Sequence, residues 1–140
     1  MEEKKKVLLV DDEIDFLEII GARIKNWGYE LITATNGKEG IDALKNKRPD
    51  IIVLDYMMPE MDGVTTLKKM RKINSEIPVI MFSAFPDRRA LEGTEELGIK
   101  TFIPKLSSFS DVQGTLRSAI NMAEKEIEKN QRGQNGRGRF

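Results

Sequence analysis

Three aspartates follow two short apolar runs, where packing alone gives no reason for acidic side chains. Asp11 and Asp12 come directly after Val7–Val10, and Asp55 comes directly after Ile51–Leu54. Short β-branched runs bounded by polar residues are typical of buried strands. If the two strands lie side by side, three carboxylates meet, and each like-charged pair repels by about 1 kcal/mol even at a water-like dielectric constant. The cluster therefore needs a positive partner, and that partner is the first clue to function.

Two further polar residues follow apolar runs and are expected at the same edge of the fold. Ser83 follows the run 79–82, and Lys105 follows the run 101–103 after one proline. Oxygen-rich clusters suit hard divalent cations such as Mg²⁺, which takes one or two carboxylates and often shares a phosphate. The Met57 carbonyl offers a further ligand. One carboxylate can then attack phosphorus and become an acyl phosphate, while the metal, Lys105 and Ser83 hold the phosphoryl oxygens.

Each of these residues, taken alone, has a structural explanation. A single aspartate after a strand is usually a cap for the next helix, a lone serine is more often a turn residue, and a lone lysine is usually solvated. The combination is what favours phosphoryl chemistry. Asp15 and Asp62 lie past the strand ends and are interpreted as first-turn acids or helix caps. Asn36 is a plausible cap for the helix that follows it, and Gly98 a C-cap residue.

The elements that must position these residues alternate regularly along the chain. Segments with helical periodicity separate and follow five apolar runs, which are 7–10, 31–34, 51–54, 79–82 and 101–103. This alternation predicts an α/β fold with a parallel sheet covered by helices on both faces. Right-handed crossovers then give a doubly wound five-stranded sheet. Ligand sites in such sheets lie at the carboxyl ends of the strands, which is where the three aspartates fall.

The composition excludes several classes of catalyst. The 140 residues are 39% hydrophobic, enough for the core of one domain, and 23 basic side chains balance 23 acidic ones. Zero net charge argues against bulk attraction to nucleic acid or to an anionic membrane. The absence of cysteine and histidine removes thiol catalysis, Ser-His-Asp arrangements and imidazole metal sites. No stretch is apolar enough for a membrane span or a signal sequence, so we expect a soluble cytoplasmic protein.

Four motifs together resemble the receiver domain of two-component response regulators. They are Leu8–Glu13, Ile51–Gly63, Ser83–Ala84 and Phe102–Lys105. The resemblance covers roughly residues 7 to 127 and implies a flavodoxin-like sheet with strand order 2-1-3-4-5. We assign residues 1–130 to the receiver domain. Residues 131–140 lack periodicity and are rich in glycine and arginine, so we expect a disordered polar and basic tail or linker there.

The resemblance also implies roles for the clustered residues. Asp55 corresponds to the phospho-acceptor, and Asp11 and Asp12 correspond to the metal-binding acids, with Asp55 and the Met57 carbonyl as further Mg²⁺ ligands. Lys105 corresponds to the lysine that pairs with the phosphoryl group. The donor is expected to be a phosphohistidine on a separate histidine kinase or phosphotransfer protein, which fits the absence of histidine here.

Two more residues correspond to the switch of the family. Ser83 is expected to move toward the phosphoryl group, and the Phe102 ring is expected to turn inward with it. An unknown output protein would then dock on the fourth helix, fifth strand and fifth helix. Such a protein is only loosely an enzyme, since it promotes its own phosphorylation from phospho-donors and its own slow dephosphorylation. Both a stand-alone regulator and the receiver part of a longer protein fit the sequence.

The sequence departs from the usual family pattern in ways that predict distinct behaviour. Leu106 follows Lys105 where the family usually has proline; a non-proline cis bond costs about 3 kcal/mol, which favours a trans bond and leaves the loop shape open. Gly93 lies within the predicted fourth helix, 87–97, and is compatible with close packing or with a soft helix on the switching face. Met57 and Phe85 are bulky and apolar beside the expected phosphoryl site, which suggests a long-lived acyl phosphate.

Two other classes of protein stay open on the residues alone. A Mg²⁺-dependent phosphohydrolase acting through an aspartyl phosphate would need a second acid two residues after the nucleophile, where Met57 stands. A flavin-binding flavodoxin-like protein would need a phosphate loop rich in serine, threonine and glycine after the first strand. The acidic run Asp11–Glu13 would instead repel a phosphate unless a metal intervened.

Overall fold

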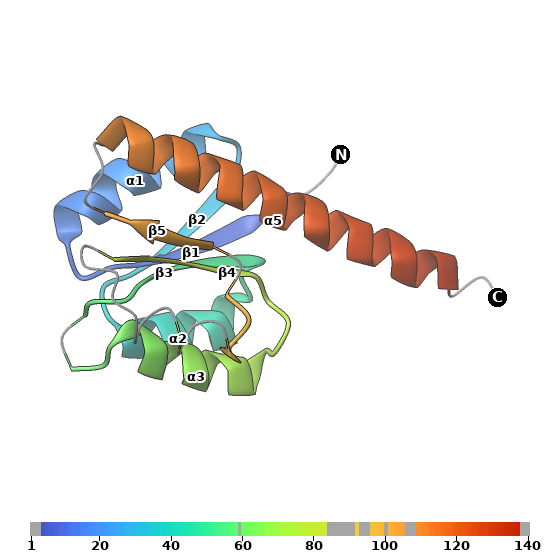
Figure 1. Cartoon of the computed structure of the whole chain (residues 1–140), viewed down its shortest axis with the longest axis horizontal. Helices are drawn as coiled ribbons and strands as arrows, with labels where there is room; N and C mark the ends of the chain where they lie inside the picture. Colours follow the sequence, from blue (N-terminus) through green and yellow to red (C-terminus); the bar gives the residue numbers. More distant parts are fainter. Residues whose placement is uncertain are drawn as a thin grey trace.

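The computed structural model describes residues 4–58, 60–83, 92, 96–99, 101–105 and 109–137. Their strands form one parallel sheet in the order β2-β1-β3-β4-β5, as predicted. The bounds of the strands are β1 (Lys6–Val10), β2 (Glu30–Ala34), β3 (Ile51–Asp55), β4 (Val79–Ser83) and β5 (Thr101–Pro104). The described helices are α1 (Ile14–Asn26), α2 (Gly37–Lys47), α3 (Gly63–Ile73) and α5 (Phe109–Arg137). Figure 1 shows α1 and α5 on one face of the sheet and α2 and α3 on the other.

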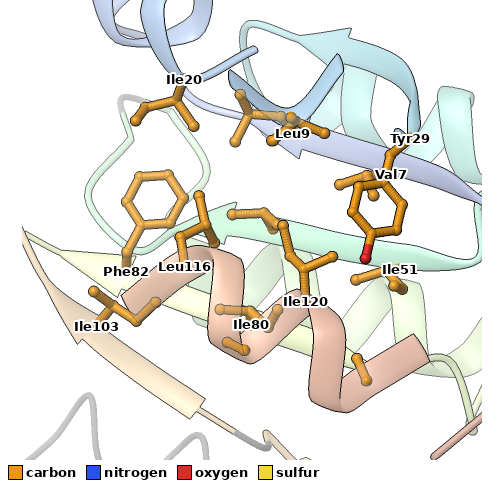
Figure 2. Close-up of a cluster of buried hydrophobic side chains, with 14 of the residues drawn as sticks. Val7, Leu9, Ile20, Tyr29, Ile51, Ile80, Phe82, Ile103, Leu116 and Ile120 are labelled. Atoms are coloured by element: carbon orange, nitrogen blue, oxygen red, sulfur yellow. The ribbon is translucent and has the colours of Figure 1, made fainter. Parts of the chain in front are cut away.

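The sheet is covered on both faces because its central strands β1, β3 and β4 are apolar except at their ends, where Lys6, Asp55 and Ser83 stand. In β1, Val7 and Leu9 belong to the cluster under α1 and α5, whereas Leu8 and Val10 belong to the cluster over α2 and α3. A strand buried on both faces reads as a continuous apolar run, which explains the runs in the sequence. Figure 2 shows the first cluster, in which side chains of the sheet meet those of α1 and α5.

Capping residues hold the helices at the positions that the sequence predicts. The Asn36 side chain accepts a hydrogen bond from the Glu39 amide (2.8 Å), and Asp62 accepts one from the Thr65 amide (2.8 Å). Gly98 has a φ angle of +75°, a left-handed conformation that favours glycine. The caps predicted at Asn36 and Asp62 are therefore confirmed, whereas the helix that Gly98 is predicted to end lies largely outside the described residues. Asp62 starts α3 and is not part of the acidic cluster.

Helix α5 is longer than the periodicity of the sequence suggests. Its apolar stripe packs on the sheet as far as Ile127, yet the helix continues to Arg137. The disordered tail expected from residue 131 thus differs from the structure, in which helix reaches seven residues further. In Figure 1 the C-terminal part of α5 extends beyond the sheet, so its own backbone hydrogen bonds rather than packing maintain it.

Several predicted features lie outside the described residues. Most of the expected fourth helix, including Gly93, lies outside them, as do Phe85 and Leu106. Among the helices that the structure does describe, none is both long and apolar enough to cross a membrane.

Candidate functional site

The three predicted aspartates meet at the carboxyl end of the sheet. Strands β1 and β3 are neighbours, with Val10 level with Leu54, so the residues that follow them lie side by side. Asp11, Asp12 and Asp55 each offer a carboxylate oxygen, and these oxygens lie within 4.8 Å of one another. The side chains of Asp11 and Asp55 are almost fully buried, at 0% and 2% exposed, whereas Asp12 is partly exposed. The cluster therefore has two shielded charges and one that faces solvent.

Lys105 supplies the positive partner that this cluster requires. Its Nζ lies 2.8 Å from Asp11 Oδ2 and 3.3 Å from Asp55 Oδ2. A third carboxylate, Glu13 Oε1, lies 3.2 Å away. The backbone of Lys105 is held beside the end of β4, because its amide donates to the Ser83 carbonyl (2.7 Å). The lysine is thus a buried member of the site, with 9% of its side chain exposed, rather than a solvated side chain.

The electrostatic balance of the site is unfavourable to a second negative charge. Burial and the nearby Asp11 charge raise the pKa of Asp55 to about 7, although Lys105 and the Met57 amide oppose this. Burial also raises the pKa of Asp11, with Lys105 and the Glu13 amide opposing. Burial lowers the pKa of Lys105, but hydrogen bonding to Asp11 and the Asp55 charge outweigh it, so the pKa of Lys105 is raised. One ammonium does not compensate for all the acids.

The loop after β3 folds tightly around Asp55. The Met57 amide donates to Asp55 Oδ1 (3.1 Å), and the Gly63 amide donates to the Tyr56 carbonyl (2.8 Å). A Cβ at Gly63 would lie only 2.6 Å from Tyr56 Cα and 2.7 Å from the Asp55 carbonyl oxygen, so only glycine fits this turn. The first turn of α3 is consequently held against the end of β3, and the Met57 amide helps to orient the Asp55 carboxylate.

The two predicted switch residues lie on the adjacent strands. Ser83 ends β4 and is fully buried, and β4 pairs directly with β3, with Asp55 level with Phe82. Phe102 is half-buried on β5 and packs against the cluster on the α2 and α3 side of the sheet. Ser83 therefore lies on the strand beside Asp55, whereas Phe102 lies one strand further away, on the face of the sheet that α2 and α3 cover.

Sequence reasoning missed three residues of this site. Glu13 is a partner of Lys105, and the rings of Phe16 and Phe82 lie against the Lys105 ammonium. Glu13 was visible as the third acid of the run after β1. The two rings gave no separate signal, because Phe16 reads as part of the apolar stripe of a helix and Phe82 as part of a strand.

The comparisons with known proteins agree with this geometry. The response regulator receiver domain family matches residues 7–117. This chain belongs to that family. A probable transcriptional regulator, ycf27, of Cyanophora paradoxa is 36% identical over 121 residues, which are 86% of this chain and 50% of that protein. The chain thus spans about half the length of the curated relatives it matches.

Solved receiver domains share the fold of this one. The Francisella response regulator 1452 receiver domain is 30% identical, with a TM-score of 0.75 over 89% of this chain and 99% of that one. A CheX–CheY complex with BeF₃ and Mg²⁺ from Borrelia burgdorferi contains a match with 31% identity and a TM-score of 0.73, over 83% of this chain and 89% of that one. The acidic pocket with Lys105 is therefore the phospho-acceptor pocket of a receiver domain, which favours this function over a phosphohydrolase or a flavin protein.

Proposed function

We propose that the chain is a phosphorylation-dependent switch that takes a phosphoryl group from a sensor-kinase phosphohistidine onto Asp55. The observation that carries the proposal is the position of the Asp55 carboxylate. It is buried at the end of β3, with Asp11 on one side and the Lys105 ammonium 3.3 Å away. In the transfer, an Asp55 oxygen bonds to phosphorus while the bond from phosphorus to the histidine nitrogen breaks.

The chemistry of the donor set fits Mg²⁺. Three carboxylate oxygens within 4.8 Å of one another, with one of the acids open to solvent, match a hard cation that keeps several of its waters. Asp11 and Asp12 would hold the ion, together with Asp55 and the Met57 carbonyl. When bound, Mg²⁺ neutralises charge on the phosphoryl oxygens and favours the ionised form of Asp55. The Borrelia complex, which contains BeF₃ and Mg²⁺, supports the assignment.

Lys105 changes partners in this proposal. It is bound to the carboxylates of Asp11, Glu13 and Asp55 in the structure, and it would donate instead to a phosphoryl oxygen on Asp55. Ser83 would close on the same group from the end of β4, and Phe102 would rotate inward as it does so. The Lys105 amide donates to the Ser83 carbonyl, and this hydrogen bond would couple the movements of the two residues.

The partners follow from this switch. The donor is a histidine kinase or a phosphotransfer protein, since the chain itself has no histidine. An output protein would bind the face made by β5, α5 and the expected fourth helix. The curated relatives include probable transcriptional regulators, so an output domain in a longer protein is one form that this partner can take.

The exposed Met57 side chain is expected to slow hydrolysis of the acyl phosphate. It lies two residues after Asp55 and is 52% exposed, and the resemblance to the family implies that this position flanks the phosphoryl group, where water must approach. Met57→Asn should therefore shorten the lifetime of phosphorylated protein, measured as loss of the phosphorylated species after the donor is removed. An unchanged lifetime would contradict this role of the methionine.

The central test is modification of Asp55 itself. Purified protein is incubated with acetyl phosphate, with and without Mg²⁺, and the site of phosphorylation is located by mass spectrometry. We expect Mg²⁺-dependent phosphorylation that disappears in Asp55→Asn and persists in Asp62→Asn, which alters an exposed aspartate on the same loop. Phosphorylation that survives in Asp55→Asn would refute the assignment of the acceptor.

A further inference from the structure

Two phenylalanine rings face the ammonium of Lys105. Its Nζ lies 4.4 Å from the ring centroid of Phe16 on α1 and 4.8 Å from that of Phe82 on β4. The rings contact each other as well, with centroids 5.0 Å apart and planes tilted by 31°. A cation within about 6 Å of a ring centroid is attracted by the ring quadrupole, more strongly where water is excluded. With 9% of its side chain exposed, Lys105 is in such a place.

The rings bind the ammonium without using its hydrogen-bond donors. A lysine ammonium has three donors, and in the structure the three go to carboxylates of Asp11, Glu13 and Asp55. Two of these acceptors change role when the pocket is loaded, because Asp11 turns to the metal and Asp55 carries the phosphoryl group. The contacts with the rings do not depend on either event, so they can hold the ammonium while its donors change partners.

We propose that Phe16 and Phe82 are positioning residues that keep the Lys105 ammonium at the phosphoryl site in both the free and the phosphorylated state. This inference rests on the proposed function and adds two residues to its machinery. Figure 2 shows Phe82 reaching from β4 into the core near Ile20 and Leu116, so its position is held by packing. Core packing thereby holds the Phe82 ring in place, and the ring in turn attracts the Lys105 ammonium.

The competing explanation is that both rings only fill space. Phe82 is buried in the core and Phe16 is partly buried against it, so packing alone would account for aromatic side chains there. The two explanations differ in what they predict for rings of similar size and weaker quadrupole. Packing is insensitive to ring fluorination to first order, whereas attraction for a cation falls as fluorine withdraws charge from the ring face.

The first experiment measures urea denaturation, without ligand and with BeF₃⁻ and Mg²⁺, of protein with phenylalanine or its mono-, di- and trifluorinated forms at position 16. Because the ring contact is kept in both states, we expect the folding equilibrium constant to fall progressively in both, by up to about fivefold, equivalent to about 1 kcal/mol. The same series in a Lys105→Met background is the control, and there the fall should vanish. Equal stability across the series in the wild-type background, an equal fall in both backgrounds, or a fall confined to the ligand-free protein would overturn the proposal.

A second experiment follows the lysine directly by nuclear magnetic resonance. Ring currents of Phe16 and Phe82 should shift the Lys105 Cε protons upfield in the free protein, and the shift should persist after BeF₃⁻ and Mg²⁺ are added. Loss of the shift on binding would show that the ammonium leaves the rings, which contradicts the proposal. Failure of wild-type protein to be modified at Asp55 would instead refute the proposed function, so the two failures are distinguishable.

Discussion

The buried Asp55 carboxyl group is expected to destabilise the metal-free protein at neutral pH. Its pKa is raised from 3.8 to about 7, because burial and the Asp11 charge outweigh the attraction of Lys105. Between these two values the folded protein binds more protons at this site than the unfolded chain does, so stability falls as pH rises. Asp55→Asn removes the charge and should therefore stabilise the protein above pH 7, with little effect near pH 4.

The size of this effect can be bounded from the structure. The difference between about 7 and 3.8 corresponds to an upper limit of about 4 kcal/mol, at 1.36 kcal/mol for each pH unit. Relaxation of the site and entry of water reduce such penalties, and the variant also loses one contact of Lys105. We therefore expect Asp55→Asn to gain about 2 kcal/mol in free energy of unfolding at pH 8.

The assay is urea denaturation at pH 4.5 and pH 8 in the presence of a chelator. Asp42→Asn, which removes an exposed carboxylate from α2, controls for the change in net charge. Adding Mg²⁺ should shrink the advantage of Asp55→Asn, since the ion stabilises wild-type protein by RT ln(1 + [Mg²⁺]/Kd). A variant no more stable than wild type at pH 8 without metal, or an equal gain at both pH values, would refute the reasoning.

Three further changes test other parts of the structure. Lys105→Met leaves two buried carboxylates without their cation and should lower stability by about 3 kcal/mol at pH 8 and by less at pH 4.5, measured by the same denaturation. Asp62→Ala removes the cap that accepts from the Thr65 amide and should lower the free energy of unfolding by about 1 kcal/mol. Tyr29→Phe removes the 2.9 Å hydrogen bond to Asn121 and should lower the free energy of unfolding by about 1 kcal/mol. Because burial and Glu124 raise the pKa of Tyr29 to about 12, the variant should also lose a phenol titration near pH 12, measured by ultraviolet absorbance.

The sequence predicts the fold and the acidic cluster because both follow from short-range patterns. Apolar runs and helical stripes define the elements, and the placement of acids at the ends of β1 and β3 requires only that these strands be neighbours. The contacts of Lys105 were not predictable in the same way. They join positions 94, 92 and 50 residues apart, and which acids a long flexible side chain reaches depends on packing.

The length of α5 shows a different limit of sequence reasoning. Residues 131–137 have no apolar periodicity and include two glycines, each of which costs about 1 kcal/mol in a helix relative to alanine. Propensity therefore favours an end near residue 130. Extending an existing helix avoids the cost of nucleation, however, so a polar segment attached to a packed helix can remain helical where an isolated one would not.

The electrostatic strain of the pocket has a direct consequence for signalling. Because burial and the Asp11 charge raise the pKa of Asp55 to about 7, part of this carboxyl group is protonated at neutral pH without metal, and a protonated carboxyl group is a poor nucleophile. On the proposed function, a cation held by Asp11 and Asp12 would offset the charge that raises this pKa, so metal binding and activation of Asp55 would be linked. Lys105 alone does not achieve this, because its donors are divided among three carboxylates. On the proposed function, the pocket would react only when both positive partners, the divalent cation and Lys105, are in place.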